Sequence, residues 1–506
     1  MHPHSKESLA LLVDLGSTFT KVTAVDLDHG RVLGRGQAPS TVASDVCAGL
    51  LSALGNLQRS HPVFRECPKD IGELEGFFVR ASSSAAGGLR MVVIGLVPGL
   101  TVEAANAAAL GAGGKIVGIF AFKLGAAQAA QIAQLKPDIV LLTGGTDGGD
   151  TQTLLHNAAL LARSGVSAPV VVAGNRAAAG QAHDLLAAAG KEVCCADNVM
   201  PAASDIAPHS AQEAIRGYFM RRIIEAKGLD RVQSLVPIVL PTPMAVLQAA
   251  VLGAQGTAGG QGWGELLLAD VGGATTDIYS IGDGRQTEQD TIPKGLPEPY
   301  AKRTVEGDLG IRSNAATILK RVGADALHAQ FVELFPTLGT TRRELLDYVE
   351  GISEETDRVP RQDWQFAADA TLARLAVDLA IERHVGRKEP YYASGGTVFL
   401  QVGKDLTETA ALIGTGGVFT HNPYADHILS PGVRHKERYD VLRPEAPAII
   451  IDRDYILYAV GLLAESHPMV ALRIFQDHIG GGRVPLAAVD QAAGASPQGG
   501  AGHSCC

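Results

Sequence analysis

The sequence predicts a protein of several α/β domains, in which two copies of one strand-rich design flank a module of alternating strands and helices. Three observations support this prediction. The chain has 506 residues, which is too long for one compact core. A pattern of apolar run, aspartate, glycine and hydroxyl residues occurs near the start and again near the middle. Between the two copies, apolar runs alternate with helical stretches, which is typical of parallel βαβ units.

Composition restricts the class of protein. Apolar residues make up 46% of the chain and charged residues 19%, which is typical of a globular protein. The net charge of −10 provides no basic surface for nucleic acid or anionic membranes. The six cysteines form no C-x-x-C pair, and neither a secretory signal nor a long uncharged apolar stretch is evident. We therefore expect a cytoplasmic protein with no nucleic-acid or membrane partner, and a homo-oligomer remains open.

The pattern of strands and helices divides the chain into five segments. Residues 1–111 open with three strand-like runs, followed by a helical stretch at "SDVCAGLLSALGNL". Residues 112–253 contain four apolar runs separated by helices, which predicts an inserted doubly wound α/β module. Residues 254–420 restart the first design after a glycine-rich linker. Residues 421–490 are expected to pack back on the core, and residues 491–506 to form a flexible, low-complexity tail.

The repeated stretch is the most informative feature. It reads "VDLGSTFTKV" at residues 13–22 and "ADVGGATTDI" at residues 269–278. Glycine allows tight turns in which backbone N–H groups approach an anion, and the hydroxyl side chains add donors. Asp14 and Asp270 would end their strands at the mouths of these turns. Two carboxylates would repel a polyphosphate unless a hydrated Mg²⁺ lay between them. One copy alone would be an ordinary hairpin more often than not, but two matching copies favour a functional site.

Two further glycine-rich stretches are ambiguous. "ASGGTVF" at residues 393–399 could let the backbone approach a flat nucleoside, although a plain tight turn is the alternative. "TGGTDGGD" at residues 143–150 follows a predicted strand and would be either an anion site or a glycine-rich βα turn. No stretch matches the G-x-x-x-x-G-K-[ST] phosphate loop.

Together, the repeated stretch and "ASGGTVF" resemble the phosphate-1, phosphate-2 and adenosine motifs of the actin/Hsp70/sugar-kinase ATPase superfamily, in the expected order. The resemblance implies duplicated ribonuclease-H-like (actin-like ATPase) domains that close on Mg-ATP in a central cleft. It implies that Asp14 orders the hydration shell of Mg²⁺ and that Asp270 holds metal-bound water or polarises the attacking water. The residues implied to contact the nucleotide are Gly16, Ser17, Thr18, Lys21, Gly272, Gly273, Thr275, Thr276, Gly395, Gly396 and Thr397.

The sequence leaves the roles of some neighbouring side chains undecided. Lys21 follows Asp14 by an odd number of residues, and side chains alternate along a strand. The sequence therefore does not decide whether Lys21 faces the phosphates. Asp277 would either orient the second loop or be solvated. Glu306 and Asp308 could face the ribose or the metal, or could be the acidic first turn of a helix. Cys505 and Cys506 lie in the predicted tail.

Longer phrases narrow the resemblance to one family. The stretches "ASSSAAGGLRMVVIGLVPGLTVEAA", "DIVLLTGGTDGGD" and "GLPEPYAKRTVEGDLGIRSNA" are similar to the glutamate mutase accessory proteins. These resemble factors that reactivate adenosylcobalamin-dependent enzymes. The resemblance implies a chaperone-like ATPase that releases damaged cobalamin from a mutase such as glutamate mutase. A small-molecule kinase of the same superfamily and a non-hydrolysing, nucleotide-gated scaffold are the alternatives. By analogy, residues 112–253 would form the client-binding surface.

Overall fold

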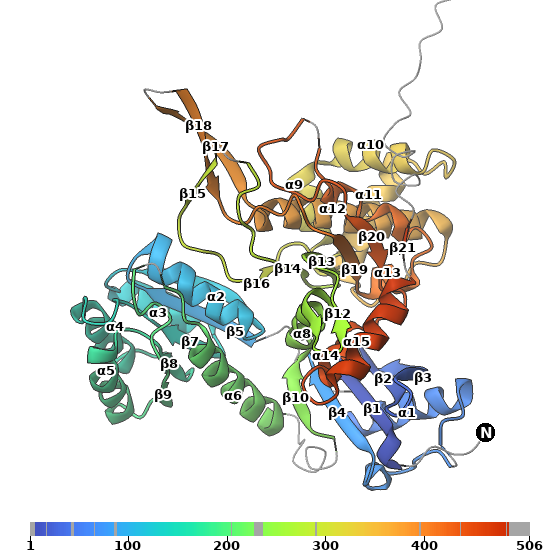
Figure 1. Ribbon diagram of the computed structural model, residues 1–506, viewed down its shortest axis with the longest axis horizontal. Coiled ribbons are helices and arrows are strands. Elements are labelled where there is room, and N and C mark those ends of the chain that lie inside the picture. The colour runs from blue at the N-terminus through green and yellow to red at the C-terminus, as the bar shows by residue number, and fades with distance from the viewer. Residues whose placement is uncertain are drawn as a thin grey trace, which may run out of the picture.

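The computed structural model describes residues 6–484, apart from residues 17, 42–44, 65, 85–88, 204, 227–235, 289–290, 394–395, 436 and 482. Two mixed sheets lie on either side of a central pair of helices, and a third, parallel sheet lies to one side (Figure 1). None of the described helices is both long and apolar enough to cross a membrane.

The first sheet has the strand order β10-β4-β1-β2-β3. Its first three strands form an antiparallel meander, and β4 and β10 then add in parallel on the other side of β1. Helix α1 packs on β3 and β2 and begins after Asp45, whose carboxylate caps it by accepting from the Cys47 N–H. The elements are β1 (Leu9–Leu15), β2 (Phe19–Asp26), β3 (Arg31–Pro39), α1 (Val46–Ser60), β4 (Phe78–Ser83) and β10 (Ile238–Pro241).

The second sheet repeats this topology. Its order is β16-β14-β13-β19-β20-β21, with an antiparallel meander of β13, β14 and β16 and parallel addition of β19 and β20. The strands are β13 (Leu266–Val271), β14 (Thr276–Ile281), β16 (Ala301–Glu306), β19 (Ala411–Thr415), β20 (Ala448–Ile451) and β21 (Arg483–Val484). The associated helices are α9 (Ala315–Val322), α10 (Ala324–Leu334), α11 (Arg342–Glu354), α12 (Asp363–His384) and α13 (Gly417–His421). The predicted duplication of one sheet design is thus confirmed by strand order and direction.

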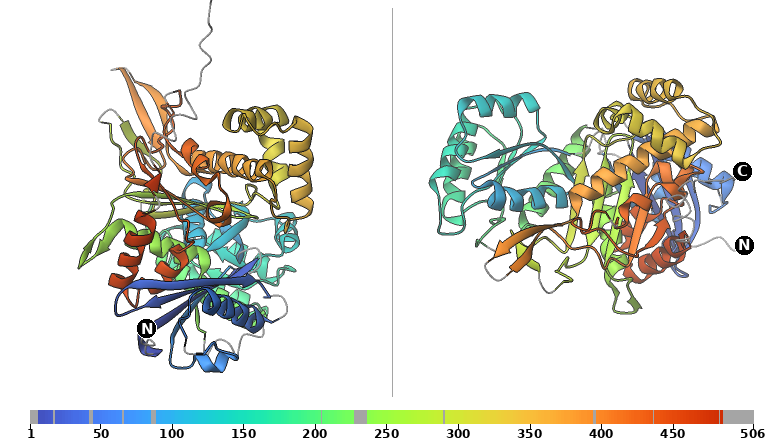
Figure 2. Two further views of the ribbon diagram at one scale, coloured as in Figure 1. Left: turned by 90° about the vertical axis from the view of Figure 1, so that its right-hand side faces the viewer. Right: turned by 90° about the horizontal axis from the view of Figure 1, so that it is seen from above.

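The third sheet is entirely parallel, with the order β6-β5-β7-β8-β9. Figure 2 shows it beside the other two sheets. Its strands are β5 (Leu89–Gly95), β6 (Gly114–Ala121), β7 (Ile139–Leu142), β8 (Val170–Val172) and β9 (Val193–Cys195). Its helices are α2 (Glu103–Gly111), α3 (Ala126–Leu135), α4 (Gln152–Ala162), α5 (Arg176–Ala188) and α6 (His209–Ala226). We call the unit formed by residues 89–226 the parallel module.

The boundaries of the parallel module differ from those expected from the sequence. Strand β5 lies before residue 112 but belongs to this module, whereas β10 lies before residue 253 but belongs to the first sheet. Both strands are short apolar runs, and only their pairing partners assign them to a sheet.

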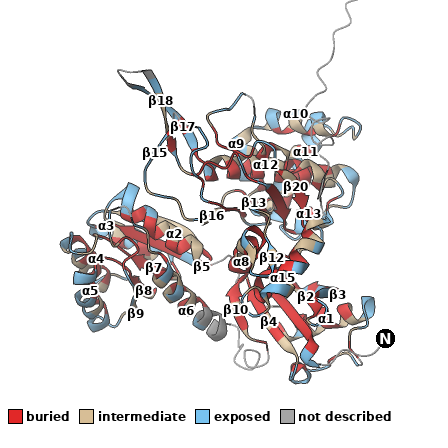
Figure 3. Ribbon diagram, viewed as in Figure 1, coloured by how far each residue is buried: buried red, intermediate tan, exposed pale blue. Residues whose placement is uncertain are grey.

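A shared core joins the two mixed sheets. One face of each mixed sheet packs on the helices α8 (Thr242–Gln255) and α14 (Leu457–Leu463), which lie between the two sheets. The central strands of both sheets are buried (Figure 3). Leu12 and Leu268 contribute to this core from β1 and β13. Because side chains alternate along a strand, Asp14 and Asp270 lie on these same faces, two residues farther along. The helix α15 (Pro468–Ile474) and the hairpin of β11 (Gly256–Thr257) and β12 (Gly260–Gln261) complete this region.

Three strands form an arm that projects from the second domain (Figure 1). They are β15 (Thr291–Lys294), β17 (Arg387–Ala393) and β18 (Gly396–Val402), in the order β15-β18-β17. The predicted nucleoside stretch lies in this arm.

Candidate functional site

Asp14 lies at the end of β1 and is anchored from two neighbouring elements. Its side chain is buried. Oδ1 accepts hydrogen bonds from Thr242 Oγ1 at 2.7 Å and from Ser82 Oγ at 3.2 Å. Thr242 is the first residue of α8, so the helix between the domains begins on this carboxylate. A buried carboxylate with two neutral donors keeps lone pairs free for a further cationic partner.

The first loop has the tight turn that its glycine predicts. Gly16 N–H donates to the Phe19 carbonyl at 3.1 Å, and a Cβ at Gly16 would lie 2.5 Å from that oxygen. Ser40 holds the loop from β3 by donating its hydroxyl to the Gly16 carbonyl at 2.8 Å. Thr18 is exposed at the turn, and Ser17 lies outside the described residues.

Lys21 faces the site. It is the register partner of Asp14 across the β1–β2 pair, and its Nζ lies 3.8 Å from Asp14 Oδ2. The ammonium also lies over the Tyr455 ring, 3.2 Å from the ring centroid. Burial lowers the pKa of Lys21, and the negative charges of Asp14, Asp270 and Asp452 oppose this shift. Lys21 therefore lies in the field of carboxylates from both sheets.

Asp270 is the counterpart of Asp14 on β13. Burial and, to a smaller extent, the charge of Asp277 raise its pKa to about 7, against the opposing charges of Lys21 and Arg303. The charge of Asp14 also raises this pKa to a small extent, so the two predicted carboxylates lie within range of each other's charge. A divalent cation would relieve the repulsion. No cluster of three or more His, Cys, Asp or Glu suited to a metal occurs among the described residues.

The second loop is held from behind by residues 309–313. The carbonyls of Gly272 and Gly273 accept from backbone N–H groups of this segment at 2.9–3.1 Å. Thr276 is buried and donates its hydroxyl to the Leu309 carbonyl at 2.7 Å. Thr276 thus fixes the loop from within, whereas Gly273 is exposed and Thr275 half-buried.

Asp277 forms a buried ion pair. Its Oδ2 accepts from Arg303 Nη2 at 2.8 Å, and both side chains are nearly inaccessible. The alternative of a solvated turn carboxylate is therefore wrong. Arg303 also donates to the carbonyls of Leu110 and Gly114, at 3.0 and 3.2 Å. The second sheet is thereby tied to the junction of α2 and β6 in the parallel module.

Among the predicted nucleoside residues, the described ones, Gly396 and Thr397, lie on the arm and do not join the two loops. Gly396 begins β18, Thr397 is exposed on the arm, and Gly395 lies outside the described residues. A different glycine turn follows β19 and lies beside Asp270. A Cβ on Gly416, whose φ is 110°, would lie 3.0 Å from Asp270 Oδ1 and 2.5 Å from the Val271 carbonyl. This turn lies in the stretch "LIGTGGVF", which contains two adjacent glycines after a small polar residue, as "ASGGTVF" does.

Sequence reasoning also missed a third strand-end carboxylate. Asp452 follows β20 and is buried, accepting from Thr415 Oγ1 at 2.9 Å and from the Ile456 N–H. Burial raises its pKa. The apolar run "AIII" followed by aspartate was a usable signal. Burial and, to a smaller extent, the charge of Lys21 lower the pKa of His421 at the end of α13.

Residues 143–150 form a glycine-rich βα turn whose polar groups form hydrogen bonds within the parallel module. Asp150 Oδ2 accepts from the Thr153 N–H at the start of α4, and Asp147 Oδ1 accepts from the Arg176 N–H at the start of α5. Buried Asn175 donates to the Gly149 carbonyl. Since two carboxylates already occupy these helix starts, the arrangement favours the turn over an anion site.

Glu306 and Asp308 are ion-paired rather than free. Arg383 Nη1 contacts Glu306 and lies 2.9 Å from Asp308 Oδ1, and Arg321 pairs with the other oxygen of Asp308. Burial raises the pKa of Glu306, and Arg383 opposes the shift.

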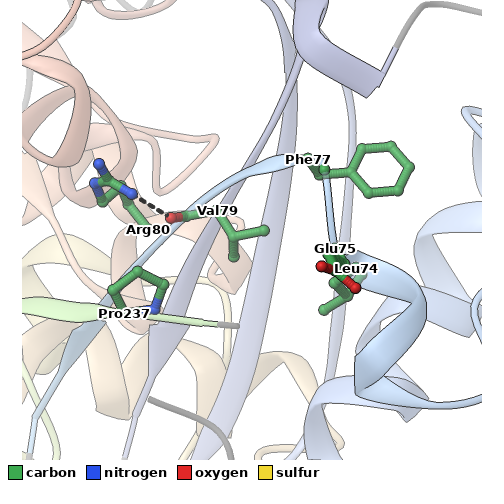
Figure 4. Close-up of a pocket in the computed structure, with 7 residues that line it drawn as sticks. Leu74, Glu75, Phe77, Val79, Arg80 and Pro237 are labelled. Carbon is green, nitrogen blue, oxygen red and sulfur yellow. Dashed lines mark hydrogen bonds between the residues drawn. The ribbon is translucent and has the colours of Figure 1, made fainter. Parts of the chain in front are cut away.

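One small cavity lies outside this site. It has a volume of about 190 Å³ and lies beside β4, with Arg80 donating to the Val79 carbonyl at its edge (Figure 4). None of its lining residues belongs to either loop; they are Leu74, Glu75, Gly76, Phe77, Val79, Arg80 and Pro237.

The duplicated sheets and their paired carboxylates define a two-domain α/β protein with the actin-like ATPase fold. A family model described as "MutL protein" matches residues 10–479. Protein MutL of Clostridium tetanomorphum is 38% identical over 472 residues, covering 93% of this chain and 98% of that protein. The chain therefore belongs to the MutL protein family, and the resemblance to glutamate mutase accessory proteins is confirmed.

Solved structures are more distant. Acetone carboxylase in its nucleotide-free form is 14% identical, with a TM-score of 0.41, over 90% of this chain and 70% of that one. Xylulose kinase from Bifidobacterium adolescentis is 13% identical, with a TM-score of 0.29, over 92% and 94%. At these scores, the fold assignment depends on the strand topology described above.

The raised pKa of Asp270 predicts a pH dependence of stability. Because the folded protein holds this proton more tightly than the unfolded chain, the contribution of Asp270 to stability falls as the pH rises from about 4 to about 7. Asp270→Asn should therefore raise the thermal midpoint relative to wild type at pH 8, by about 1 °C per kcal/mol, but hardly at pH 4. Thermal melts in metal-free, nucleotide-free buffer measure this difference. An equal shift at both pH values would contradict the assignment.

Proposed function

We propose that this protein is an ATP-dependent reactivating factor for an adenosylcobalamin-dependent mutase, with glutamate mutase as the first client to test. Membership of the MutL family is the observation that carries the proposal. In this role, ATP hydrolysis opens the complex with the mutase, damaged cobalamin leaves and intact coenzyme enters. The protein acts in the cytoplasm, on a client protein rather than on a small substrate.

The site geometry supports nucleotide binding. Asp14 and Asp270 would hold Mg²⁺ through water, and bound Mg-ATP supplies a phosphoanhydride whose hydrolysis releases free energy. Gly16, Ser17 and Thr18 from one sheet and Gly272, Gly273 and Thr275 from the other would offer backbone and hydroxyl donors to the phosphates. The turn at Gly416 is better placed than Gly396 and Thr397 to meet the nucleoside, because it lies beside Asp270.

The parallel module is proposed as the client-binding unit. All residues assigned above to the nucleotide site lie outside residues 89–226. The link through Arg303 would let domain movement reach this module.

A reactivation assay tests the proposal. Glutamate mutase inactivated with damaged cobalamin should regain activity when this protein, Mg-ATP and fresh adenosylcobalamin are added together, and not when ATP is replaced by a non-hydrolysable analogue. With ATP labelled in its γ-phosphate, the label should be released as free inorganic phosphate. Transfer of the label to a small acceptor would favour the kinase, and full recovery with the analogue would favour the nucleotide-gated scaffold. Absence of recovery with glutamate mutase and with other adenosylcobalamin-dependent mutases would refute reactivation.

A further inference from the structure

Strand β6 is an edge strand of the parallel module, and among the described residues no other strand pairs with its outer side. It ends the sheet and pairs with β5 on one side. Residues 116–122 read "IVGIFAF", a run without a polar side chain. Ile119 is 53% exposed and Phe122 is 58% exposed. A long apolar edge strand with unpaired backbone groups is a template for another strand, and natural proteins usually cover it.

The end of β6 is held in a strained conformation that keeps an aromatic ring exposed. Phe122 has a φ of 67°, which is unusual for a bulky residue. Its N–H donates to the Gly95 carbonyl at 3.0 Å, and its own carbonyl accepts from the buried Asn157 at 3.0 Å. Val97 and Leu100, just after β5, are each 36% exposed and add to the apolar surface.

Two lysines determine which strand fits this edge. Lys115 and Lys123 bracket the apolar run, and neither forms an ion pair with another described residue. If two copies of β6 paired antiparallel about a twofold axis, Lys115 at the start of one strand would approach Lys123, which lies just beyond the end of the other. Like charges opposite each other destabilise a strand pair, whereas acidic partners stabilise it. The charges therefore favour a different protein whose strand is flanked by acidic residues.

The same strand is connected to the nucleotide site. Gly114, the first residue of β6, accepts the Arg303 hydrogen bond. Arg303 pairs with Asp277, which is the register partner of Asp270 across the β13–β14 pair. A strand bound at β6 would thus be linked to Asp270, a predicted metal carboxylate, through Arg303 and Asp277.

We propose that an extended segment of the client protein adds to the outer edge of β6 as a sixth strand, with apolar residues at its centre and acidic residues at its ends. This inference rests on the proposed function, because it identifies the docking surface of the client.

A designed peptide tests the docking edge without requiring a known client. The fluorescent probe alternates valine and threonine in its centre and carries two aspartates at each end. The full-length protein should bind it saturably, and hydrogen exchange at residues 116–122 should slow. Ile119→Lys should abolish binding, because a charged edge blocks strand addition. Lys123→Glu should weaken it about fivefold. The matched controls Leu185→Lys and Lys136→Glu, at exposed positions of the same module, should leave binding unchanged.

Three results would overturn the inference. These are equal binding of a probe with lysines in place of the aspartates, protection from exchange only outside residues 116–122, or concentration-dependent dimerisation that protects the same residues without any probe. The reactivation assay separates this inference from the proposed function. Ile119→Lys should lose reactivation while keeping basal ATP hydrolysis. If the wild type reactivates the mutase and Ile119→Lys does so equally well, docking at β6 is wrong although the proposed function stands.

Discussion

Asp14→Asn should reduce ATP hydrolysis by about a hundredfold or more, and Asp270→Asn should do the same. Each change removes one of the two strand-end carboxylates, of which Asp14 contributes to raising the pKa of Asp270. Asparagine can still accept the hydrogen bonds from Thr242 and Ser82, so Asp14→Asn should remain folded. Release of labelled phosphate under saturating Mg-ATP measures the effect.

The matched control is Asp184→Asn, which changes an exposed carboxylate on α5 and should leave hydrolysis unchanged. Nucleotide affinity should be measured in parallel, because loss of hydrolysis with retained binding separates a role in the reaction from a role in binding. Hydrolysis at the wild-type rate in both variants would rule out the magnesium role assigned to these carboxylates.

Much of this site could be predicted because its signal is local. The stretches around Asp14 and Asp270 each combine an apolar strand, a carboxylate and a glycine turn, and the repeat of this pattern revealed the duplicated fold. The structure brings both carboxylates to the faces that share one core. The local pattern did not decide which way Lys21 faces, because this depends on the register of β1 with β2, which pairs Lys21 with Asp14.

The remaining parts of the site depend on pairings between distant segments. "ASGGTVF" and "LIGTGGVF" are equally plausible glycine turns in the sequence. They differ because β19 pairs with β13, whereas β18 pairs with β15 and β17 in the arm. The contact of Thr242 with Asp14 likewise joins residues far apart in the chain. Strand pairing of this kind follows from the global fold and not from any short motif.

Gly461→Ala should destabilise the protein by about 1–3 kcal/mol and should also slow hydrolysis. Gly461 lies on α14 where this helix crosses α8, and a Cβ there would overlap the carbonyl oxygen of Ala245. The two helices would have to separate within the core that joins the two sheets. Because α8 begins at Thr242, its displacement would shift the donor that holds Asp14.

Thermal melts and phosphate release measure the two effects of Gly461→Ala, with an expected fall in the melting midpoint of about 1 °C for each kcal/mol. Gly180→Ala on α5 is the matched control, since no atom lies within 4 Å of an added Cβ there. Alanine favours the helix by about 0.5–1 kcal/mol over glycine, so this control should be neutral or stabilising. If both variants melt and hydrolyse alike, close packing of α14 on α8 does not position the carboxylate of Asp14.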